Sequence, residues 1–369
     1  MNAFASGGTL ASIQASNPFF APPSYFSVAN QINNPKYLEW NFEIQQAIDP
    51  KTVLTLNYVG THGYNILVQN GSVNAINATG AQFGQIPTTA TDPRFGAVTE
   101  LASVGRSNYD GLVTTVTRKF TYGFQGSVNY TFSHSLDDLT STSPNTPYNG
   151  AQSVVYQINP NNLRQLNYGN SDSDARHNLT ANYVWTLPYK FQNRLMEQAV
   201  GGWTVAGTFF YHSPFPYSAL TTEGGIVNIP GPVQPILASF NGGNTGNCSS
   251  PGTIASPNQC LSASQFLTPG QQTVFGNVPR NSFRGPGYFD TDFSLLKNFS
   301  VTERVKFQMG ANFFNILNHP NFNAPVNNVT AGNFGQITST TVQPTTPYGS
   351  YQGAGVSGRL TQITAKVIF

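Results

Sequence analysis

Residues 122–132 read Tyr-Gly-Phe-Gln-Gly-Ser-Val-Asn-Tyr-Thr-Phe, an almost perfect alternation of apolar and polar side chains. The apolar members are Tyr122, Phe124, Val128, Tyr130 and Phe132. The polar members that alternate with them are Gln125, Ser127, Asn129 and Thr131. Successive side chains of a β-strand lie on opposite faces of its sheet. The stretch therefore predicts a strand with one apolar face and one polar face.

The same period of two recurs along the chain. It is clear in residues 38–48 and 178–187, where Trp40, Phe42, Tyr183 and Trp185 alternate with Asn, Thr, Glu and Gln. We expect further strands at Thr52–Gly60, Asn108–Phe120, Trp203–Tyr211, Phe289–Phe299, Arg304–Phe314 and Arg359–Phe369, and a weaker one near Asn65–Ala75. This makes roughly nine or ten strands of about ten residues each, the length that crosses a bilayer when tilted by about 45°.

The predicted strands are joined by two kinds of connection. Very short ones lie at Asp49-Pro50, Thr121 and Ser300–Glu303, whereas long polar ones span about 136–174, 213–287 and 315–358. Outer-membrane barrels alternate short periplasmic turns with long outer loops in this way. A compact soluble domain with three such loops would be unusual. The fold class that we predict is therefore all-β, an antiparallel transmembrane β-barrel.

The composition supports this class and excludes others. Only 9% of the 369 residues are charged, against about 25% in ordinary soluble domains, while 13% are aromatic. The net charge of +2 gives no basic excess for nucleic acid, and the aromatic content argues against disorder. No stretch approaches the roughly 20 apolar residues of a membrane helix. Aromatic residues near strand ends suit the girdles of a barrel: Trp40, Tyr58, Tyr109, Tyr122, Trp185, Trp203, Tyr211 and Phe299.

The C-terminus carries a local signal. Ile363, Ala365, Val367 and the terminal Phe369 alternate with Gln362, Thr364, Lys366 and Ile368. An amphipathic last strand with a terminal aromatic residue resembles the signal by which the barrel assembly machinery recognises outer-membrane barrels. We therefore expect these four apolar residues to serve as a barrel-assembly signal.

Several runs together resemble the C-terminal part of Oar-like TonB-dependent receptors of the acidobacterial type. The runs are Asn34–Gln45 with Thr52–Gly63, Arg106–Leu112 with Arg118–Phe120 and Asn129–Ser133, Asp174–Asn178 with Gly201–Trp203, and Asn281–Phe289 with Lys297–Phe299, Thr302–Arg304 and Phe313–Phe322. The resemblance begins at about Asn33 and leaves out the middle loop, Thr221–Pro269. It implies nutrient uptake across the outer membrane, with ligand held by outer loops and a plug that TonB moves.

The chain departs from that family in its length. Residues 1–23 lack a basic segment and an apolar segment, so they do not form a signal peptide. A plug and a TonB-docking motif are also missing from the sequence, and receptors of this kind have barrels of about 22 strands. We therefore expect a fragment or a separate reading frame, with an irregular segment over 1–32 and a barrel portion over 33–369. The expected partners are outer-membrane lipid, the barrel assembly machinery, a small or oligomeric ligand, and plug and TonB through the missing N-terminal part.

No catalytic, cofactor or metal site is predicted. The histidines are scattered, without the spacing of a metal site. Ser133, His134 and Ser135, followed by Asp137 and Asp138, supply the residue types of an outer-membrane enzyme, but a triad is defined by geometry. Asp172 and Asp174 are too close in sequence for a Ca²⁺ loop and lack its glycine and terminal glutamate. We expect ordinary polar loops at both places.

Two further assignments concern single residues. Arg304 and Lys306 alternate with Val305 and Phe307, so we predict that both point into the polar lumen. Cys248 and Cys260 lie twelve apart in a Gly/Ser/Asn-rich stretch, without a zinc pattern. We predict a loop disulfide between them, formed in an oxidising compartment.

Two functional alternatives remain open beside the receptor, with an outer-membrane enzyme a more distant third. The chain could be a complete porin-like channel of about ten strands, or a secreted β-rich adhesin. A closed channel would run as a heat-modifiable band after folding in detergent, and an adhesin would be monodisperse without detergent. The sequence does not distinguish carbohydrate, siderophore and peptide-like ligands.

Overall fold

The structure is a computed structural model of the chain. It describes residues 10–16, 22–70, 88–138, 167–221, 236–243, 260–267, 276–300, 305–341 and 358–369, with shorter stretches at 73–74, 76–77, 152–153, 226–227, 252–253, 256–257 and 302.

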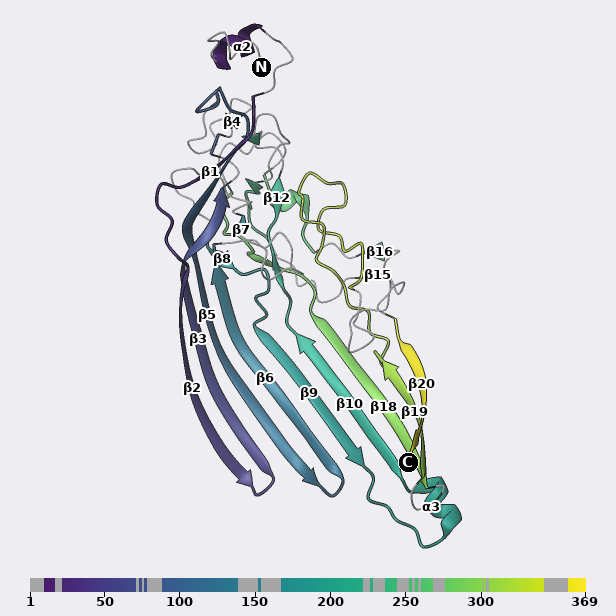
Figure 1. Ribbon diagram of the computed structural model, residues 1–369. Helices are drawn as coiled ribbons and strands as arrows, with labels where there is room; N and C mark the ends of the chain where they lie inside the picture. The colour runs from purple at the N-terminus through teal and green to yellow at the C-terminus, as the bar shows by residue number, and fades with distance from the viewer. Residues whose placement is uncertain are drawn as a thin grey trace.

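Nine long strands form one continuous meander in this part of the chain (Figure 1). In sheet order they are β2 (Lys36–Asp49), β3 (Thr52–Asn70), β5 (Val98–Thr121), β6 (Phe124–Asp137), β9 (His177–Thr186), β10 (Trp203–His212), β18 (Tyr288–Ser300), β19 (Lys306–Phe314) and β20 (Leu360–Ile368). Each runs antiparallel to the next. The predicted antiparallel barrel portion is confirmed.

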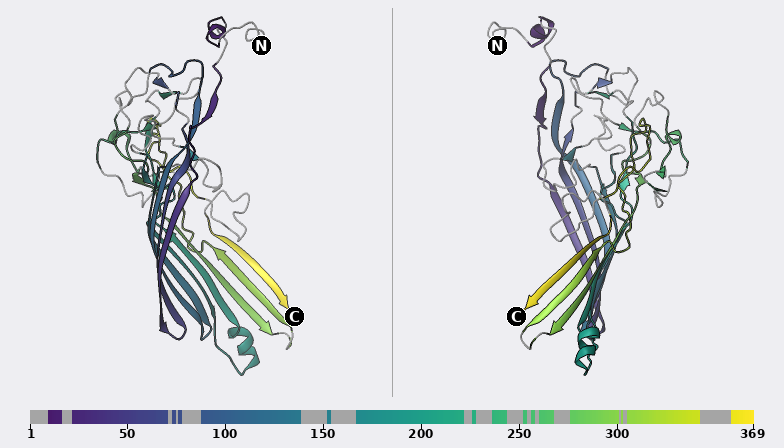
Figure 2. Two further views of the ribbon diagram at one scale, coloured as in Figure 1. Left: turned by 60° about the vertical axis from the view of Figure 1, so that its left-hand side comes forward. Right: turned by 90° about the vertical axis from the view of Figure 1, so that its right-hand side faces the viewer.

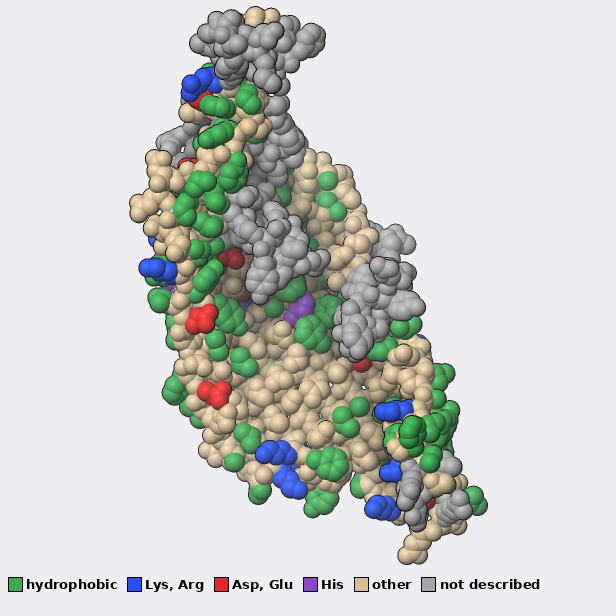
Figure 3. Space-filling view, in the orientation of Figure 1, with side chains coloured by type: hydrophobic (Ala, Val, Ile, Leu, Met, Phe, Trp, Pro, Cys, Tyr) green, Lys and Arg blue, Asp and Glu red, His purple; other side chains and the backbone are tan. Residues whose placement is uncertain are grey.

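The register sorts the side chains into two faces, because directly paired residues share a face of the sheet. Phe124 pairs with Trp185 and Tyr130 with Leu179. This apolar face has many exposed members, including Trp40, Phe42, Val128, Phe132, Met309, Ile363 and Val367. The opposite, polar face includes Ser127, Asn129, Asn182, Thr208, Asn312 and Gln362. Figure 3 looks onto an area over β6, β9 and β10 in which neutral polar side chains and backbone predominate.

The hairpin between β5 and β6 turns on Tyr122 and Gly123, with φ angles of 49° and 80°. Two-residue hairpin turns often need positive φ at both positions, since this matches the twist of the flanking strands. Tyr122 was expected in the apolar set of β6, and this was wrong. Its side chain is 87% exposed because it occupies the turn.

The short connections share one end of the sheet, here called the turn end (Figure 1). The same end holds helix α3 (Arg194–Val200), in the connection between β9 and β10, and the C-terminus. At the opposite, loop end, the connections cover residues 71–97, 138–176, 213–287 and 315–359. The first of these was not anticipated as a long loop.

β3 and β5 are much longer than expected, with 19 and 24 residues. Their pairing shifts register between Tyr64 and Leu67, where Asn65 adopts a φ of 57°. Such a bulge interrupts the alternation of faces. The sequence pattern therefore stops near Gly60, although the strand continues to Asn70.

Several short helices and strands lie at the loop end. In the N-terminal 32 residues, expected to be irregular, α2 (Leu10–Ser16) forms one short helix and β1 (Tyr25–Val28) pairs in parallel with β5. Two-residue strands pair as β4 (Ile76–Asn77) with β13 (Ile226–Val227), β11 (Pro216–Tyr217) with β17 (Phe283–Arg284), β12 (Leu220–Thr221) with β14 (Ile236–Leu237), and β15 (Gly252–Thr253) with β16 (Ser256–Pro257). β7 (Gln152–Ser153), β8 (Gly169–Asn170) and the 3₁₀ helix η1 (Ala263–Gln265) complete the set.

The sheet curves but does not close, and its edges β2 and β20 lie apart (Figure 2). Eight antiparallel pairings separate these two strands, so both run from the loop end to the turn end. Direct pairing of β2 with β20 would therefore be parallel. Among the described residues, no helix is long and apolar enough to cross a membrane.

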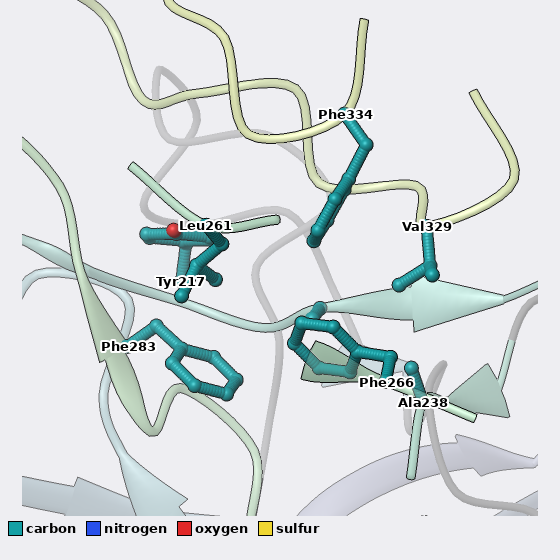
Figure 4. Packing of buried hydrophobic residues seen from close by; sticks show 8 residues of the cluster. Tyr217, Ala238, Leu261, Phe266, Phe283, Val329 and Phe334 are labelled. Atoms are coloured by element: carbon teal, nitrogen blue, oxygen red, sulfur yellow. The ribbon is translucent and has the colours of Figure 1, made fainter. Parts of the chain in front are cut away.

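The hydrophobic core lies in the loops rather than in the sheet. Its buried members are Tyr217, Ala219, Ala238, Leu261, Phe266, Phe283, Val329 and Phe334, with Phe240 and Val278 packed against them. The ring centroid of Phe266 lies 5.8 Å from that of Phe283 and 5.4 Å from that of Phe334 (Figure 4). Burial also raises the pKa of Tyr217. The core joins the connection after β10 to the connection after β19.

Candidate functional site

The polar face carries an open hollow of about 500 Å³ across five neighbouring strands. Its polar lining comes from Asn182, Thr208, Asp292, Ser294, Asn312 and Gln362. Thr208 pairs with Asp292, and Asn312 pairs with both Ser294 and Gln362, so the lining follows the rows of the sheet. Amide, hydroxyl and carboxylate groups at this spacing can exchange hydrogen bonds with water or with a hydroxyl-rich solute.

An aromatic hollow of about 140 Å³ lies at the loop end of the same face. The His212 ring stacks on Tyr288, with centroids 5.3 Å apart and planes 8° apart, and it contacts Phe215 at 4.2 Å. His212 Nδ1 donates to the carbonyl oxygen of Ser213 at 2.8 Å, which fixes the ring orientation. The rest of the lining comes from Gly285, Pro286, Gly287, Phe322, Asn323, Ala324 and Thr341. Flat rings beside amide groups can bind the face of a sugar or of an aromatic ligand.

A buried arginine ties two connections of the loop end together. Arg280 is 1% exposed and forms ion pairs with Asp137, at the end of β6, and with Asp172, at 3.0 Å. Its Nε also donates to the carbonyl oxygen of Asn167 at 3.1 Å. A buried guanidinium is tolerated only when its charge and its N–H groups have partners. Arg280 therefore holds the connection after β10 against the connection after β6.

The next residue extends this junction. Asn281 donates from Nδ2 to Asp172 at 2.7 Å and to the carbonyl oxygen of Asn170 at 2.8 Å. In return, Asn170 donates from Nδ2 to the carbonyl oxygen of Asn281. Ser218 donates to Oδ1 of Asn281 at 3.0 Å and accepts from its backbone N–H. Asn281 is thus hydrogen-bonded to the connection after β6, through Asn170 and Asp172, and to Ser218 within its own connection.

A second arginine joins two of the runs on which the sequence resemblance depends. Arg284, in the run 281–289, forms an ion pair with Asp174, in the run 174–178. It also donates to the Asp174 carbonyl oxygen at 2.6 Å. Asp174 is 1% exposed and also pairs with Arg176 at 3.0 Å. Two runs more than 100 residues apart in sequence therefore form one structural unit.

The acidic and nucleophilic residues considered in the sequence lie in this network. Asp137, Asp172 and Asp174 are paired with arginines, and Asp138 accepts from the Arg106 backbone N–H at 3.0 Å. Within the described ranges, no group of three or more His, Cys, Asp or Glu side chains could hold a metal ion.

The candidate triad residues are also engaged elsewhere. Ser133 donates to the Ala175 carbonyl oxygen at 3.2 Å, and Ser135 shares a hydrogen bond with Ser171 at 2.7 Å. His134 lies next in sequence, and therefore on the opposite face of β6, where its Nε2 contacts Asn170 at 3.1 Å. The local sequence Ser-His-Ser does not place the three side chains on one face.

The remaining predicted residues have the following positions. Lys306 begins β19 on the polar face, paired with Ser300 and Ile368, and Arg304 lies outside the described residues. Ile363, Ala365 and Val367 share the apolar face, paired with Ala311, Met309 and Phe307, and Phe369 is 96% exposed. Cys260 is buried beside Ile337 and is disulfide-bonded, while Cys248 lies outside the described residues.

The sequence reasoning missed the role of Arg280 and the aromatic group around His212. Both had a signal. In a chain with so few charges, Asp and Arg in polar loops are candidates to neutralise each other, and His212 closes an aromatic-rich strand. Neither signal gives the distant partner, because the contacts of Arg280 with Asp172 and of His212 with Tyr288 join residues more than 70 positions apart.

The chain is similar to known outer-membrane proteins. A family model described as an outer membrane beta barrel domain matches residues 2–352. No curated protein sequence matches. Solved structures that resemble the chain include the outer membrane transporter YddB of Escherichia coli, with 11% identity, a TM-score of 0.46, and coverage of 94% of this chain and 34% of that one.

Two receptors are similar at a comparable level. The pyoverdine outer membrane receptor FpvA of Pseudomonas aeruginosa has 10% identity and a TM-score of 0.40, with 90% of this chain and 30% of that chain covered. The ferric-catecholate import receptor Fiu of Escherichia coli has 11% identity and a TM-score of 0.37, with 90% of this chain and 27% of that chain covered. The chain thus spans about a third of the length of these proteins or less.

Proposed function

This chain belongs to the family of outer membrane β-barrel domains, and on that basis we propose that it forms part of the wall and outer mouth of a nutrient-uptake receptor. The chain lies in the outer membrane. The proposed receptor is TonB-dependent and takes up a scarce, bulky solute without changing it chemically.

The observation that carries the proposal is the separation of the sheet into two faces. In lipid, every backbone polar group needs an internal partner, and outward side chains must be apolar. Trp40, Phe42, Val128, Phe132 and Ile363 meet this requirement on one face. The polar face, with its hollow of about 500 Å³, suits a water-filled lumen. An adhesin in water would have no use for an exposed apolar face of this extent.

The loop end supports binding of a solute. The Arg280 and Arg284 networks hold the long connections in one arrangement, so the aromatic hollow at His212 is preformed. A preformed site saves the entropy of ordering loops on binding. Stacking rings and neighbouring amide groups suit carbohydrates, aromatic siderophores or peptide-like ligands.

The Oar-like assignment adds partners to this proposal. Arg284 and Asp174 belong to two of the runs that resemble Oar-like receptors, and they form an ion pair with each other. This contact gives the two runs a shared structural role, which supports the assignment. We propose that a plug and a TonB-docking segment act through a further N-terminal part. The apolar alternation that ends at Phe369 would direct assembly by the barrel assembly machinery, and Arg304 and Lys306 would face the lumen.

We also propose that the chain is not an enzyme. Ser133, Ser135 and the loop carboxylates have structural hydrogen-bond partners, and His134 lies on the face opposite Ser133. A nucleophile and its base would need mutual hydrogen-bond reach.

A stand-alone porin of these nine strands is disfavoured by strand direction. β2 and β20 run the same way, whereas bacterial single-chain barrels close with antiparallel pairs and an even strand number. An odd number of further strands between them would restore that pattern. We propose that such strands complete the barrel.

The test is uptake in cells that carry the complete receptor gene. Cells with and without the gene are grown on limiting maltodextrins, ferric catecholate or oligopeptides, each in the presence and absence of TonB. We expect the gene to support growth on one of these probes only when TonB is present. Growth support without TonB would overturn the receptor proposal in favour of a channel, and no gene-dependent uptake of any probe would reject uptake.

A further inference from the structure

Helix α3 has its apolar side outward. Leu195 is 76% exposed, Met196 49% and Val200 46%, and Ala199 is exposed between them. Glu197 and Gln198, on the other side, are partly buried. At 3.6 residues per turn, positions 195, 196, 199 and 200 form one continuous stripe. A helix that faces water would show the opposite arrangement.

The polar side of α3 is directed toward the polar face of the sheet. Glu197 and Gln198 line a hollow of about 500 Å³ together with Asn298, Ser300 and Lys306. Glu197 also accepts the Phe191 backbone N–H at 2.7 Å. These contacts fix the rotation of the helix, so the apolar stripe points away from the hollow.

Side chains of the apolar face attach the C-terminal part of α3 to the sheet. Trp203 donates from Nε1 to the Ala199 carbonyl oxygen at 3.1 Å. Lys297 donates to the Gly201 carbonyl oxygen, and its Nζ lies 5.3 Å from the ring centroids of Trp203 and Phe299. These three residues belong to the apolar face, since Trp203 pairs with Lys297, and Lys297 with Met309.

Trp and Lys at the end of a transmembrane strand are typical of the boundary between lipid and water. The apolar stripe of α3 continues from this boundary. Because the chain lies in the outer membrane, the apolar face of its sheet contacts lipid.

We infer that α3 is an interfacial membrane anchor, whose stripe of Leu195, Met196, Ala199 and Val200 lies among the phospholipid acyl chains of the leaflet at the turn end. The occupant is lipid rather than a protein partner for two reasons. The stripe is continuous with the lipid-contacting face, and it offers neither charge nor hydrogen-bonding groups. The helix lies in the plane of the interface, as amphipathic membrane-surface helices do.

The test measures the surroundings of single nitroxide labels in isolated outer membranes that contain the assembled receptor. Labels are placed by Leu195→Cys and Val200→Cys on the stripe, Gln198→Cys on the polar side, and Met309→Cys on the apolar face. The unsubstituted chain, treated identically, gives the background, and heat-modifiable migration verifies assembly of each variant. Collision with oxygen reports lipid, and collision with a neutral nickel chelate reports water.

We expect the labels at Leu195→Cys and Val200→Cys to prefer oxygen, as Met309→Cys does, and Gln198→Cys to prefer the nickel chelate. Nickel preference at both stripe positions would overturn the inference, since the helix would then be free in water. Low collision with both reagents would also overturn it, because a protein partner would cover the stripe. The readout does not depend on transport, so failure of the proposed uptake and failure of this inference are distinguishable.

A second variant addresses loss of contact rather than label position. Leu195→Asn with Val200→Asn removes apolar side chains that are exposed, so the sheet should still assemble. A label at Met196→Cys in this background should lose its oxygen preference and approach the value of Gln198→Cys. An unchanged oxygen preference would show that the stripe does not hold α3 in lipid.

Discussion

At the scale of the residue, the scarcity of charge makes each retained charge informative. Arg280 is almost completely buried, and its guanidinium satisfies Asp137 and Asp172 together. Removing one partner of a buried ion pair leaves the other charge unpaired in the protein interior, where water does not solvate it. The network is therefore a strong constraint on the loop end, although its net contribution to stability is smaller than the cost of breaking it.

We predict that Arg280→Met destabilises the loop end by about 3 kcal/mol, at the lower end of the range for buried pairs because Asp172 is 40% exposed. The measurement is denaturant unfolding followed by protease cleavage of the outer loops. Arg94→Met is the control, since its pair with Asp92 is exposed, and it should leave the cleavage midpoint unchanged. Equal midpoints for the Arg280→Met variant and the unsubstituted chain would refute the role of the network.

The sequence predicted on which face of the sheet a strand residue lies. It did not predict contacts between side chains that are far apart in the chain. The faces of Phe124, Val128 and Asn129 follow from alternation alone. The partners of Arg280 do not, because Asp137 is 143 residues away. Loops bring such groups together without any local period.

At the scale of the element, the two faces of β6 give a matched pair of substitutions. Val128 is 45% exposed on the apolar face, and the adjacent Asn129 lies on the polar face, where it bonds to Thr115 at 2.9 Å. We predict that Val128→Lys destabilises the barrel by about 2–4 kcal/mol, the cost of a lysine at the lipid midplane, whereas Asn129→Lys costs clearly less. Folding equilibria of the complete receptor in lipid vesicles provide the measurement. A larger cost at Asn129→Lys would reverse the assignment of the faces.

The turn between β5 and β6 gives a second element-level prediction. Gly123 has a φ of 80°, and a Cβ there would lie 1.9 Å from the Thr186 carbonyl oxygen. Gly123→Ala should therefore destabilise the hairpin by at least about 1 kcal/mol. Gly358→Ala, where a Cβ would meet nothing within 4 Å, is the control and should leave the unfolding midpoint unchanged. The two substitutions should differ in a urea unfolding series; similar midpoints would contradict the proposed turn geometry.

Strands were predicted correctly from the sequence where apolar and polar residues alternate without interruption. β2, β18 and β20 follow their alternating sequences closely. β3 and β5 continue past the bulge near Asn65, where the period is broken. The outer part of β3 was therefore expected only as a separate, weaker strand near Asn65–Ala75, and the outer part of β5, before Asn108, was not anticipated. Helix α3 was missed because seven residues between two strands give little helical period, although Asn193 caps it through Leu195 and Met196.

At the scale of the whole molecule, the sheet has two edges and the membrane tolerates none. An unpaired edge in lipid leaves backbone groups without partners, at a cost of several kcal/mol for each. The sequence predicted the barrel class and the incomplete strand number from strand length, loop pattern and resemblance. The direction of the edges could not be obtained in the same way, because it depends on the count of strands, and residues 65–75 left that count open.

The parallel direction of β2 and β20 leads to a prediction about closure. We expect no direct contact between these strands in the assembled protein, since the proposed further strands would lie between them. Cysteines introduced by Asn41→Cys, Glu43→Cys or Gln45→Cys on β2, each combined with Gln362→Cys on β20, should not be joined by a short bifunctional thiol reagent. Asn312→Cys with Gln362→Cys should be joined, because these residues pair directly on neighbouring strands. The three β2 positions cover different heights of the strand, so a shift of register would not hide a contact. A cross-link within one chain from any of them would mean that the nine strands close on themselves, and the small channel would then replace the receptor as the better account of the molecule.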